Sequence, residues 1–204
     1  MKRPNSTGFT LLELLLALAI VGALLVILLG SLRVGLAAWR QGDERAAAHQ
    51  HLRSLSELLA GSVAAAFPYH QSSLQGGEAK VQFRGEEEQL SFVTFAPPFP
   101  LAAPVPFVAV TFAARGGENP GLAITEQALP NFDPFEEAKP IFVDDSVTAV
   151  KFRYLRADGG WEERWDGAAE TRLPQAVQIN LTITLSGRAE SFPPLTISIP
   201  VRTP

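Results

Sequence analysis

The sequence contains no cysteine, which excludes disulfide bonds, thiolate metal sites and cysteine nucleophiles together. Histidine is also scarce, with three among 204 residues, so few side chains are available for general-base chemistry near neutral pH. No concentrated basic segment is present, and 17 lysines and arginines are outnumbered by 21 acidic residues. Because binding to a phosphate backbone needs a concentrated positive surface, we expect no nucleic-acid partner.

Motifs of known catalytic sites are missing as well. The sequence has no G-x-S-x-G nucleophile elbow, no H-E-x-x-H zinc motif and no glycine-rich phosphate loop. Two of the histidines, His49 and His51, are two residues apart in a predicted helix and therefore do not face each other as a metal-binding pair would. We expect no enzyme, no metal site and no cofactor.

Weak calcium binding is the one metal alternative that stays open. Oxygen ligands are available from Asp144 with Asp145, or from Asp133 with Glu136 and Glu137. Neither group lies in a loop of alternating ligands around a central glycine, which calcium-binding loops of the EF-hand type require. The acidic turn at residues 86–88 is predicted to be a solvated turn.

One long apolar segment dominates the N-terminal part of the chain. The nineteen residues from Leu14 to Leu32 carry no charge, and as a helix they would extend about 28 Å, enough to cross a bilayer. Lys2 and Arg3 precede the segment, so the positive-inside rule places the N-terminus in the cytoplasm and the chain after Arg33 on the other side. A cleaved secretory signal peptide is the alternative. The apolar run is too long for one, and no clear A-x-A cleavage site follows.

A carboxylate lies at the start of this apolar segment, in the stretch "NSTGFTLLELLLALAI". A charged group inside the apolar part of a membrane helix costs about 2.5 to 3.5 kcal/mol on insertion scales, so Glu13 is expected to have a partner and a function. The nearest available cation would be the α-amino group of Phe9, if the chain were cut before that residue.

The segment "STGFTLLELLLALAIVGALL" resembles the N-terminus of the type IV prepilin and type II secretion pseudopilin superfamily. In that family a prepilin peptidase removes a short basic leader that ends in glycine, and the new N-terminal phenylalanine is methylated. A glutamate at the fifth mature position is thought to meet the amino group of a neighbouring subunit. The resemblance implies a leader at residues 1–8, cleavage between Gly8 and Phe9, N-methylation of Phe9, and a role for Glu13 in subunit assembly.

After the apolar segment, the sequence stays helical in character but becomes amphipathic. No proline occurs between Asp43 and Ala66, and an apolar stripe recurs at spacings of three and four residues, at Leu52, Leu55, Leu59, Val63 and Ala66. Pro68 disfavours helical geometry at the residue before it. We predict one helix from Phe9 to Phe67, with a membrane-spanning part at 9–33 and an amphipathic stalk at 34–67, bent near Gly35 or Gly42.

Residues 68–204 read as β-structure interrupted by turns. The segment "AVQINLTITL" alternates apolar and polar side chains, which indicates a strand with one buried and one solvated face. "ADGG" predicts a tight hairpin turn. The expected strands are 79–84, 89–95, 107–113, 122–126, 146–156, 160–165, 175–185 and 195–201. The predicted fold class is α+β, with a long N-terminal helix packed on an antiparallel sheet, as in the pseudopilin fold.

The C-terminal third resembles one branch of the superfamily, the J-type minor pseudopilins of type II secretion. The resemblance is carried by "VKFRYLRADGGWEERWDGAAETRLPQAVQINLTI", at Phe152, Tyr154, Gly160, Trp161, Trp165, Leu173, Pro174, Ala176 and Val177. It implies a structural subunit of a pseudopilus tip complex that acts in protein export with I-type and K-type minor pseudopilins. Such a subunit is a single-pass protein of the inner membrane with a periplasmic C-terminal domain.

The alternative to this interpretation is a minor type IV pilin involved in pilus assembly, because such pilins share the N-terminus and a helix-plus-sheet domain. Residues from about 68 to 140 resemble no family that would separate the two. The sequence alone leaves open whether the system secretes proteins, extends a pilus or takes up DNA, and which cargo is involved.

Overall fold

The structure is a computed structural model, and it describes residues 10–71, 80–102, 104–117, 119–131, 133–136, 139–185 and 188–200. The chain divides into two compact units, Met1–His49 and Gln50–Pro204. The first unit holds the N-terminal part of helix α1. The second holds the end of that helix and every strand found in the described residues, so helix and antiparallel sheets combine in the predicted α+β class.

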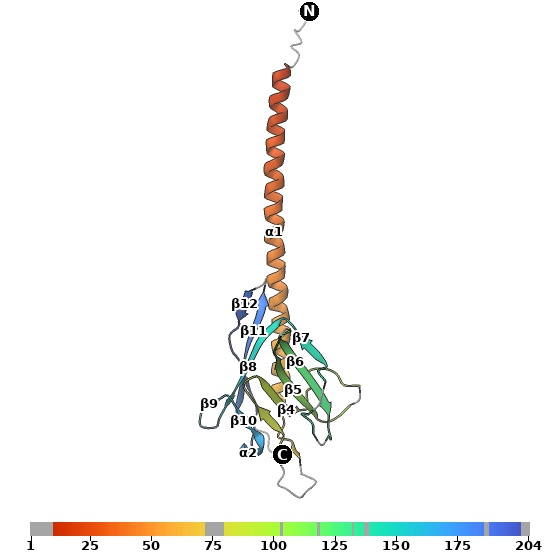
Figure 1. Cartoon of the computed structure of the whole chain (residues 1–204), viewed down its shortest axis with the longest axis vertical. Helices are drawn as coiled ribbons and strands as arrows, with labels where there is room; N and C mark the ends of the chain where they lie inside the picture. Colours follow the sequence, from red (N-terminus) through yellow and green to blue (C-terminus); the bar gives the residue numbers. More distant parts are fainter. Residues whose placement is uncertain are drawn as a thin grey trace, which may run out of the picture. The chain divides into compact units, whose positions relative to one another are not determined.

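Helix α1 runs without interruption from Leu11 to Ala64, through Gly35 and Gly42 (Figure 1). The predicted helix is therefore confirmed, with ends two and three residues inside the expected bounds. Its apolar first half is exposed, and among the described residues α1 alone is long and apolar enough to cross a bilayer.

The C-terminal end of α1 is fixed by a buried strand residue. The Thr94 hydroxyl lies 3.0 Å from the carbonyl oxygen of Ser62 and 3.1 Å from that of Ala65, so its single proton is shared between two carbonyls at the C-terminal end of the helix. The chain then leaves the helix, and the Phe67 amide donates to the Val93 carbonyl at 2.8 Å. A strand thus provides the hydrogen bonds that the helix can no longer make.

Within the second unit, the predicted apolar stripe of α1 is buried. Leu59, Val63 and Ala66 are 0% exposed, and Leu52 and Leu55 are 8% and 5% exposed. Full burial of a large apolar side chain stabilises a fold by about 1.5 to 3 kcal/mol. The stripe therefore anchors the end of α1 in the core of this unit.

Six antiparallel strands form the larger sheet, in the order β10-β3-β4-β5-β6-β7 (Figure 1). Their bounds are β3 Phe83–Gly85, β4 Gln89–Thr94, β5 Val108–Arg115, β6 Gly121–Ala128, β7 Phe142–Asp144 and β10 Trp165–Asp166. The longest pairing joins β5 to β6, from Val108 opposite Ala128 to Arg115 opposite Gly121.

The second sheet has five strands, in the order β12-β11-β8-β9, with β13 also paired to β11. Their bounds are β8 Val147–Leu155, β9 Trp161–Glu162, β11 Ala176–Leu185, β12 Arg188–Ser191 and β13 Leu195–Ser198. The predicted alternation in β11 is confirmed, because Val177, Ile179, Leu181 and Ile183 are buried between more exposed polar residues. A two-stranded ladder, β1 His70–Gln71 with β2 Lys80–Val81, and a one-turn helix, α2 Gly167–Glu170, complete the unit.

Tyr154 connects the two sheets. It lies on β8 with no exposed surface, and its ring packs edge-on to Phe83 of the larger sheet, with centroids 6.1 Å apart. Its hydroxyl donates to the Glu86 carbonyl at 2.9 Å and lies 3.3 Å from that of Gln89. The first carbonyl lies in the turn between β3 and β4 and the second in the first residue of β4, so one aromatic side chain fixes this connection to the second sheet.

The prediction of one strand from Gly160 to Trp165 is wrong. Trp161 pairs with Leu155 in the five-stranded sheet, whereas Trp165 pairs with Gly85 in the six-stranded sheet. The chain changes sheet at residues 163–164, so the two tryptophans do not share a strand face. Trp165 is 6% exposed and Trp161 is half-buried.

Candidate assembly site

Glu13 lies in the first turn of α1, with its side chain exposed. Its backbone amide donates to Thr10, at 3.1 Å to the carbonyl oxygen and 3.3 Å to Oγ1. Thr10 is therefore the N-cap of the helix, and "TLLE" has the spacing of a capping box. This capping signal was not predicted from the sequence. It gives Glu13 a local reason to occupy this position, since a carboxylate is favoured at a helix N-terminus.

The other two predicted site residues, Gly8 and Phe9, lie outside the described residues. Cleavage between them and methylation of Phe9 therefore remain predictions. Thr10 follows the predicted junction, so the residues that form the observed cap, Thr10 and Glu13, would both be retained in the processed chain.

Among the described residues of its own unit, no side chains cover the apolar part of α1. Its large aliphatic residues are more than half exposed, with Leu18 at 70% and Val26 at 71%. A contiguous apolar surface of this length is not stable in water and marks a membrane-embedded or partner-binding segment. The exposure therefore supports membrane anchoring of this part of the chain.

In the second unit, the solvent-facing side of α1 carries polar side chains. Arg53 and Glu57 are exposed and lie one turn apart, opposite the buried leucine stripe, and the next turn presents the exposed Gly61. This face leaves α1 accessible along its whole length in the unit. It is the part of the helix that a neighbouring domain can contact.

A contact that the sequence analysis did not predict fixes the same part of α1 to the larger sheet. His51 Nε2 lies 2.6 Å from Asp144 Oδ2, at the end of β7. The Asp144 side chain is only 5% exposed, and its other oxygen accepts from the backbone amide and the hydroxyl of Ser146, at 3.0 and 2.6 Å. The carboxylate is thus fully engaged by protein donors.

The calcium alternative receives no support from the described residues. Both carboxylate oxygens of Asp144 have protein partners, and Asp145 lies 3.8 Å from the Arg115 guanidinium. No group of three or more histidine or acidic side chains is positioned to hold a metal ion in the part of the chain that the structure describes. Glu137 lies outside that part.

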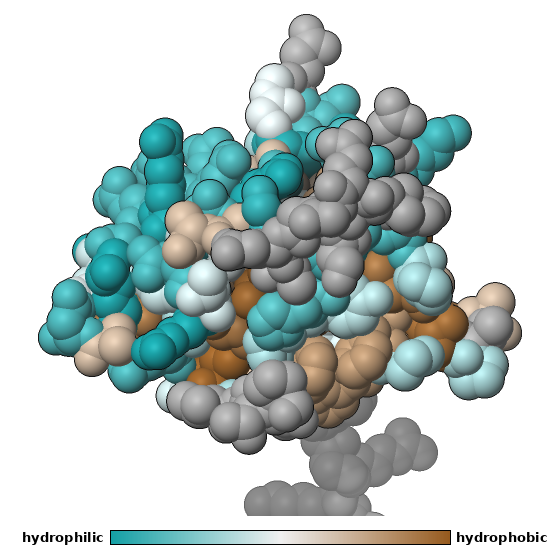
Figure 2. Space-filling view, turned by 90° about the horizontal axis from the view of Figure 1, so that it is seen from below, coloured by the Kyte–Doolittle hydropathy of each residue, from teal (hydrophilic) through white to brown (hydrophobic). Residues whose placement is uncertain are grey.

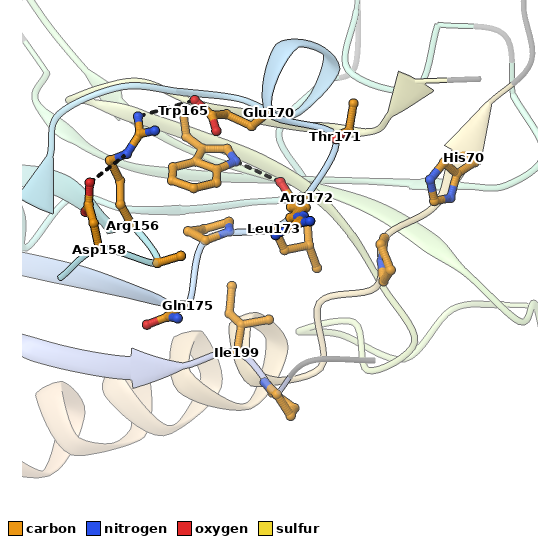
Figure 3. A pocket seen from close by; sticks show the side chains of 14 residues that line it. His70, Arg156, Asp158, Trp165, Glu170, Thr171, Arg172, Leu173, Gln175 and Ile199 are labelled. Carbon is orange, nitrogen blue, oxygen red and sulfur yellow. Dashed lines mark hydrogen bonds and ion pairs between the residues drawn. The ribbon is translucent and has the colours of Figure 1, made fainter. Parts of the chain in front are cut away.

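A cavity of about 870 Å³ lies beside α2 and the end of β13 (Figure 3). On one side, the Arg156 guanidinium contacts Glu162 at 3.0 Å, Glu170 at 3.3 Å and Asp158 at 3.7 Å. The Trp165 indole donates to the Arg172 carbonyl at 3.0 Å, and His70 lies on the opposite side of the cavity. Because the guanidinium is neutralised by neighbouring carboxylates, these contacts hold the hairpin after β8 against α2.

The acidic turn at residues 86–88 borders a second groove with Trp161. Lys151 lies 2.6 Å from Glu87, and this hydrogen bond holds the pKa of Glu87 below its ordinary value and raises that of Lys151. Both side chains are about half exposed, so the pair contributes little to stability. The face of the molecule in Figure 2 is mostly hydrophilic, with separate apolar patches.

Comparisons with known proteins agree with this geometry. The family model described as type II secretion system protein J matches residues 30–192, and the prokaryotic N-terminal methylation motif matches residues 3–29. A relative from Xanthomonas campestris pv. campestris, named type II secretion system protein J, is 28% identical over 207 residues, which cover 97% of this chain and 95% of the relative. The chain therefore belongs to the protein J family of type II secretion systems and is a minor pseudopilin.

Proposed function

We propose that this pseudopilin is a structural subunit of the pseudopilus tip complex, where it joins I-type and K-type minor pseudopilins and takes part in protein export. It is anchored in the inner membrane by residues 9–33, and its β-rich domain lies in the periplasm. The observation that carries the proposal is the combination of an exposed apolar helix with a folded β-rich unit in a protein J family member. The protein acts by association and turns over no substrate.

Processing comes first in this proposal. A prepilin peptidase removes residues 1–8 between Gly8 and Phe9, and the Phe9 amine is then methylated. The methylation-motif match over residues 3–29 supports this order. The remaining chain comprises the membrane helix at 9–33, the stalk helix at 34–67 and the globular domain at 68–204.

Mass spectrometry tests the processing step. Coexpression with a prepilin peptidase should shorten the chain by residues 1–8, and a methyltransferase should add the mass of one methyl group to Phe9. Gly8→Val should block cleavage because a bulky residue replaces the glycine that ends the leader. Recovery of assembled protein that still carries Met1 to Gly8 would contradict the proposal.

Glu13 then pairs with the amino group of a neighbouring subunit. Its exposure at the N-terminus of α1 supports this role, but its capping-box spacing from Thr10 implies a second role in helix capping. Two variants distinguish the assembly role from the capping role. Glu13→Ala should leave membrane insertion intact or improve it, since an apolar residue inserts more easily, and should weaken recruitment into the complex.

Glu13→Gln is the matched variant, because it keeps the length and capping ability of the side chain but removes the charge. We expect it to assemble as poorly as Glu13→Ala in a co-purification assay with the partner subunits. Wild-type assembly by the glutamine variant would show that helix capping is sufficient and that no charge pair forms.

Partner selection is assigned to the exported domains. We expect the soluble domain to bind the soluble domains of I-type and K-type pseudopilins through the exposed flank of the stalk helix around Arg45 to Arg53. A specific interface should bury at least about 1,000 Å². Size-exclusion chromatography of the three purified domains tests this, with Arg53→Glu expected to lower affinity more than reversal in the Glu86 to Glu88 turn.

The minor type IV pilin alternative gives a different outcome in the same experiment. Separate elution at tens of micromolar, together with binding to minor pilins of a type IV system, would favour it. In cells, deletion of this subunit should stop export of secreted enzymes and leave piliation unchanged.

A further inference from the structure

The apolar surface of α1 does not end where the charge-free segment ends. Beyond Arg33, the helix presents Leu36 and Trp39, which are 48% and 71% exposed. Together with three leucines inside the span they recur at spacings of three and four residues, at Leu25, Leu28, Leu32, Leu36 and Trp39. At 3.6 residues per turn these five side chains lie on one face, so a single stripe leaves the span and continues for nearly two turns.

Charged residues lie beside this extension but off the stripe. Arg33 and Arg40 are exposed and lie about a third of a turn from Trp39, whereas Ala37 lies on the opposite side of the helix. The segment from Arg33 to Arg40 therefore carries an exposed aromatic and aliphatic stripe that two arginines flank on one side. An apolar aromatic face beside long cationic side chains is the composition of a helix at a membrane–water interface.

Helix length agrees with that location. Glu13 and Arg33 are separated by about 30 Å along α1, which matches the hydrocarbon thickness of a bilayer. Trp39 lies about 39 Å from Glu13, and an ordinary tilt of about 20° shortens this to about 37 Å along the bilayer normal. With Glu13 at one hydrocarbon boundary, the indole is about 7 Å beyond the other, within the headgroup layer.

We propose that Trp39 docks in the headgroup layer of the outer leaflet and, with the leucine stripe, sets the depth and tilt of α1 in the membrane. This rests on the membrane anchoring in the proposed function. The partner is the phospholipid interface, where an indole ring can contact acyl chains while its N–H meets a polar acceptor. No hydrogen bond of Trp39 occurs within the described residues, so the indole N–H is available to a lipid acceptor.

Depth-dependent quenching tests the proposal on the full chain in phosphatidylcholine vesicles. The Trp39 signal is the difference between the fluorescence of the wild-type protein and that of Trp39→Phe, which removes the contribution of Trp161 and Trp165. A lipid with a nitroxide on its headgroup should quench this difference signal more than a lipid labelled in the middle of its acyl chain. Stronger quenching by the mid-chain label would overturn the assigned depth.

Two further variants in the Trp39→Phe background complete the experiment. Leu25→Trp lies in the middle of the span, so the mid-chain label should quench it. Ala37→Trp lies at nearly the depth of Trp39 but on the opposite side of the helix. It should be quenched less by the headgroup label than Trp39 if the helix tilts toward the leucine stripe.

The outcomes separate this inference from the proposed anchoring. Failure of the mid-chain label to quench Leu25→Trp would show that this part of α1 does not span the membrane. If the mid-chain label quenches Leu25→Trp but neither label quenches Trp39, α1 spans the membrane and the inference is wrong, because Trp39 would then face water or a protein partner. Equal quenching of Ala37→Trp and Trp39 would overturn the assigned tilt.

Discussion

Replacement of Gly85 by alanine tests the joint between the two sheets. Gly85 is buried on β3, directly beneath the ring of Tyr154. A methyl group on its Cα would come within 2.7 Å of both Cε atoms of that ring, and closer still to Cζ. Contacts this short do not occur between packed carbon atoms, so either the ring or the strand must move.

The ring has little freedom to move. Tyr154 is fully buried, its edge packs on Phe83, and its hydroxyl is bound by the carbonyls of Glu86 and Gln89. Adding a methylene-sized group to a packed core costs about 1 to 3 kcal/mol, and a fixed neighbour favours the upper end. For a domain of this size, a loss of about 3 kcal/mol lowers the melting temperature by about 6 to 12 °C.

Urea unfolding of a fragment that begins at Gln41 measures this loss. The fragment omits the apolar span and keeps the leucine stripe, so we expect it to be soluble and rich in β-structure. Gly61→Ala is the matched control. Gly61 is exposed on α1 with open space around its Cα, so alanine should stabilise the helix there by about 0.5 to 1 kcal/mol.

A double-mutant cycle identifies the ring as the cause. Tyr154→Phe keeps the ring, so its effect should add to that of Gly85→Ala. Tyr154→Leu removes the ring, and the two changes together should cost less than their sum by about 0.5 to 3 kcal/mol. Wild-type stability of Gly85→Ala, or the same coupling for phenylalanine and leucine, would refute the reasoning.

Three further changes test other parts of the fold. Leu55→Asp should unfold the same fragment, because it removes a buried apolar side chain and introduces an unpaired charge. Circular dichroism measures the unfolding. Full stability of the variant would mean that the stripe faces a partner subunit or solvent. Thr94→Val should lower the free energy of unfolding in urea by about 1 to 3 kcal/mol, because the carbonyls of Ser62 and Ala65 lose their hydrogen-bond donor. An unchanged free energy of unfolding would show that water replaces the hydroxyl. Burial, with the nearby Glu86 charge, raises the pKa of Tyr154, so its contribution should be complete below about pH 10 and decline above it as the unfolded chain loses the phenol proton. Urea midpoints between about pH 8 and 11 should therefore fall more for the wild type than for Tyr154→Phe, and parallel curves would contradict the assignment.

Sequence patterns predicted the elements whose signal is local and repeated. The stripe from Leu52 to Val63 has a helical period because one side of a helix faces the core, and the alternation in β11 has a period of two because one side of a strand does. Both patterns are visible without any knowledge of the partner elements. The glycine turn after β8 was predictable for a similar reason, and Gly159 adopts a positive φ of 88° there.

Other features depend on segments far apart in the chain. His51 and Asp144 are 93 positions apart, and nothing in their local sequence indicates that they meet. The strands β7 and β12 are only three and four residues long, too short for alternation to reveal. The separation of Trp161 from Trp165 reflects pairing with two different sheets, which their spacing alone does not encode.

At the candidate site, the sequence motif is more informative about function than the fold is. In the proposed function, the Gly8, Phe9 and Glu13 pattern is recognised by a processing enzyme and by neighbouring subunits, so its role lies in chemistry done to the chain. The structure adds the Thr10 cap, which was present in the sequence as "TLLE" but was obscured by the stronger apolar signal around it. Glu13 is thus placed by local helix physics at the position that the assembly model requires.

The two units have surfaces suited to different kinds of association. Leucine, valine and alanine repeat along the exposed part of α1 before Arg33, and such a surface is chemically almost the same as lipid tails. Helices of this kind associate through packing and a few polar contacts, and they distinguish poorly between similar partners. The face of the second unit with Arg53 and Glu57 carries charges of both signs, which can favour one partner and repel another. We therefore propose that selection among pseudopilins resides mainly in the β-rich unit, while the apolar helix provides membrane anchoring and a general tendency to assemble.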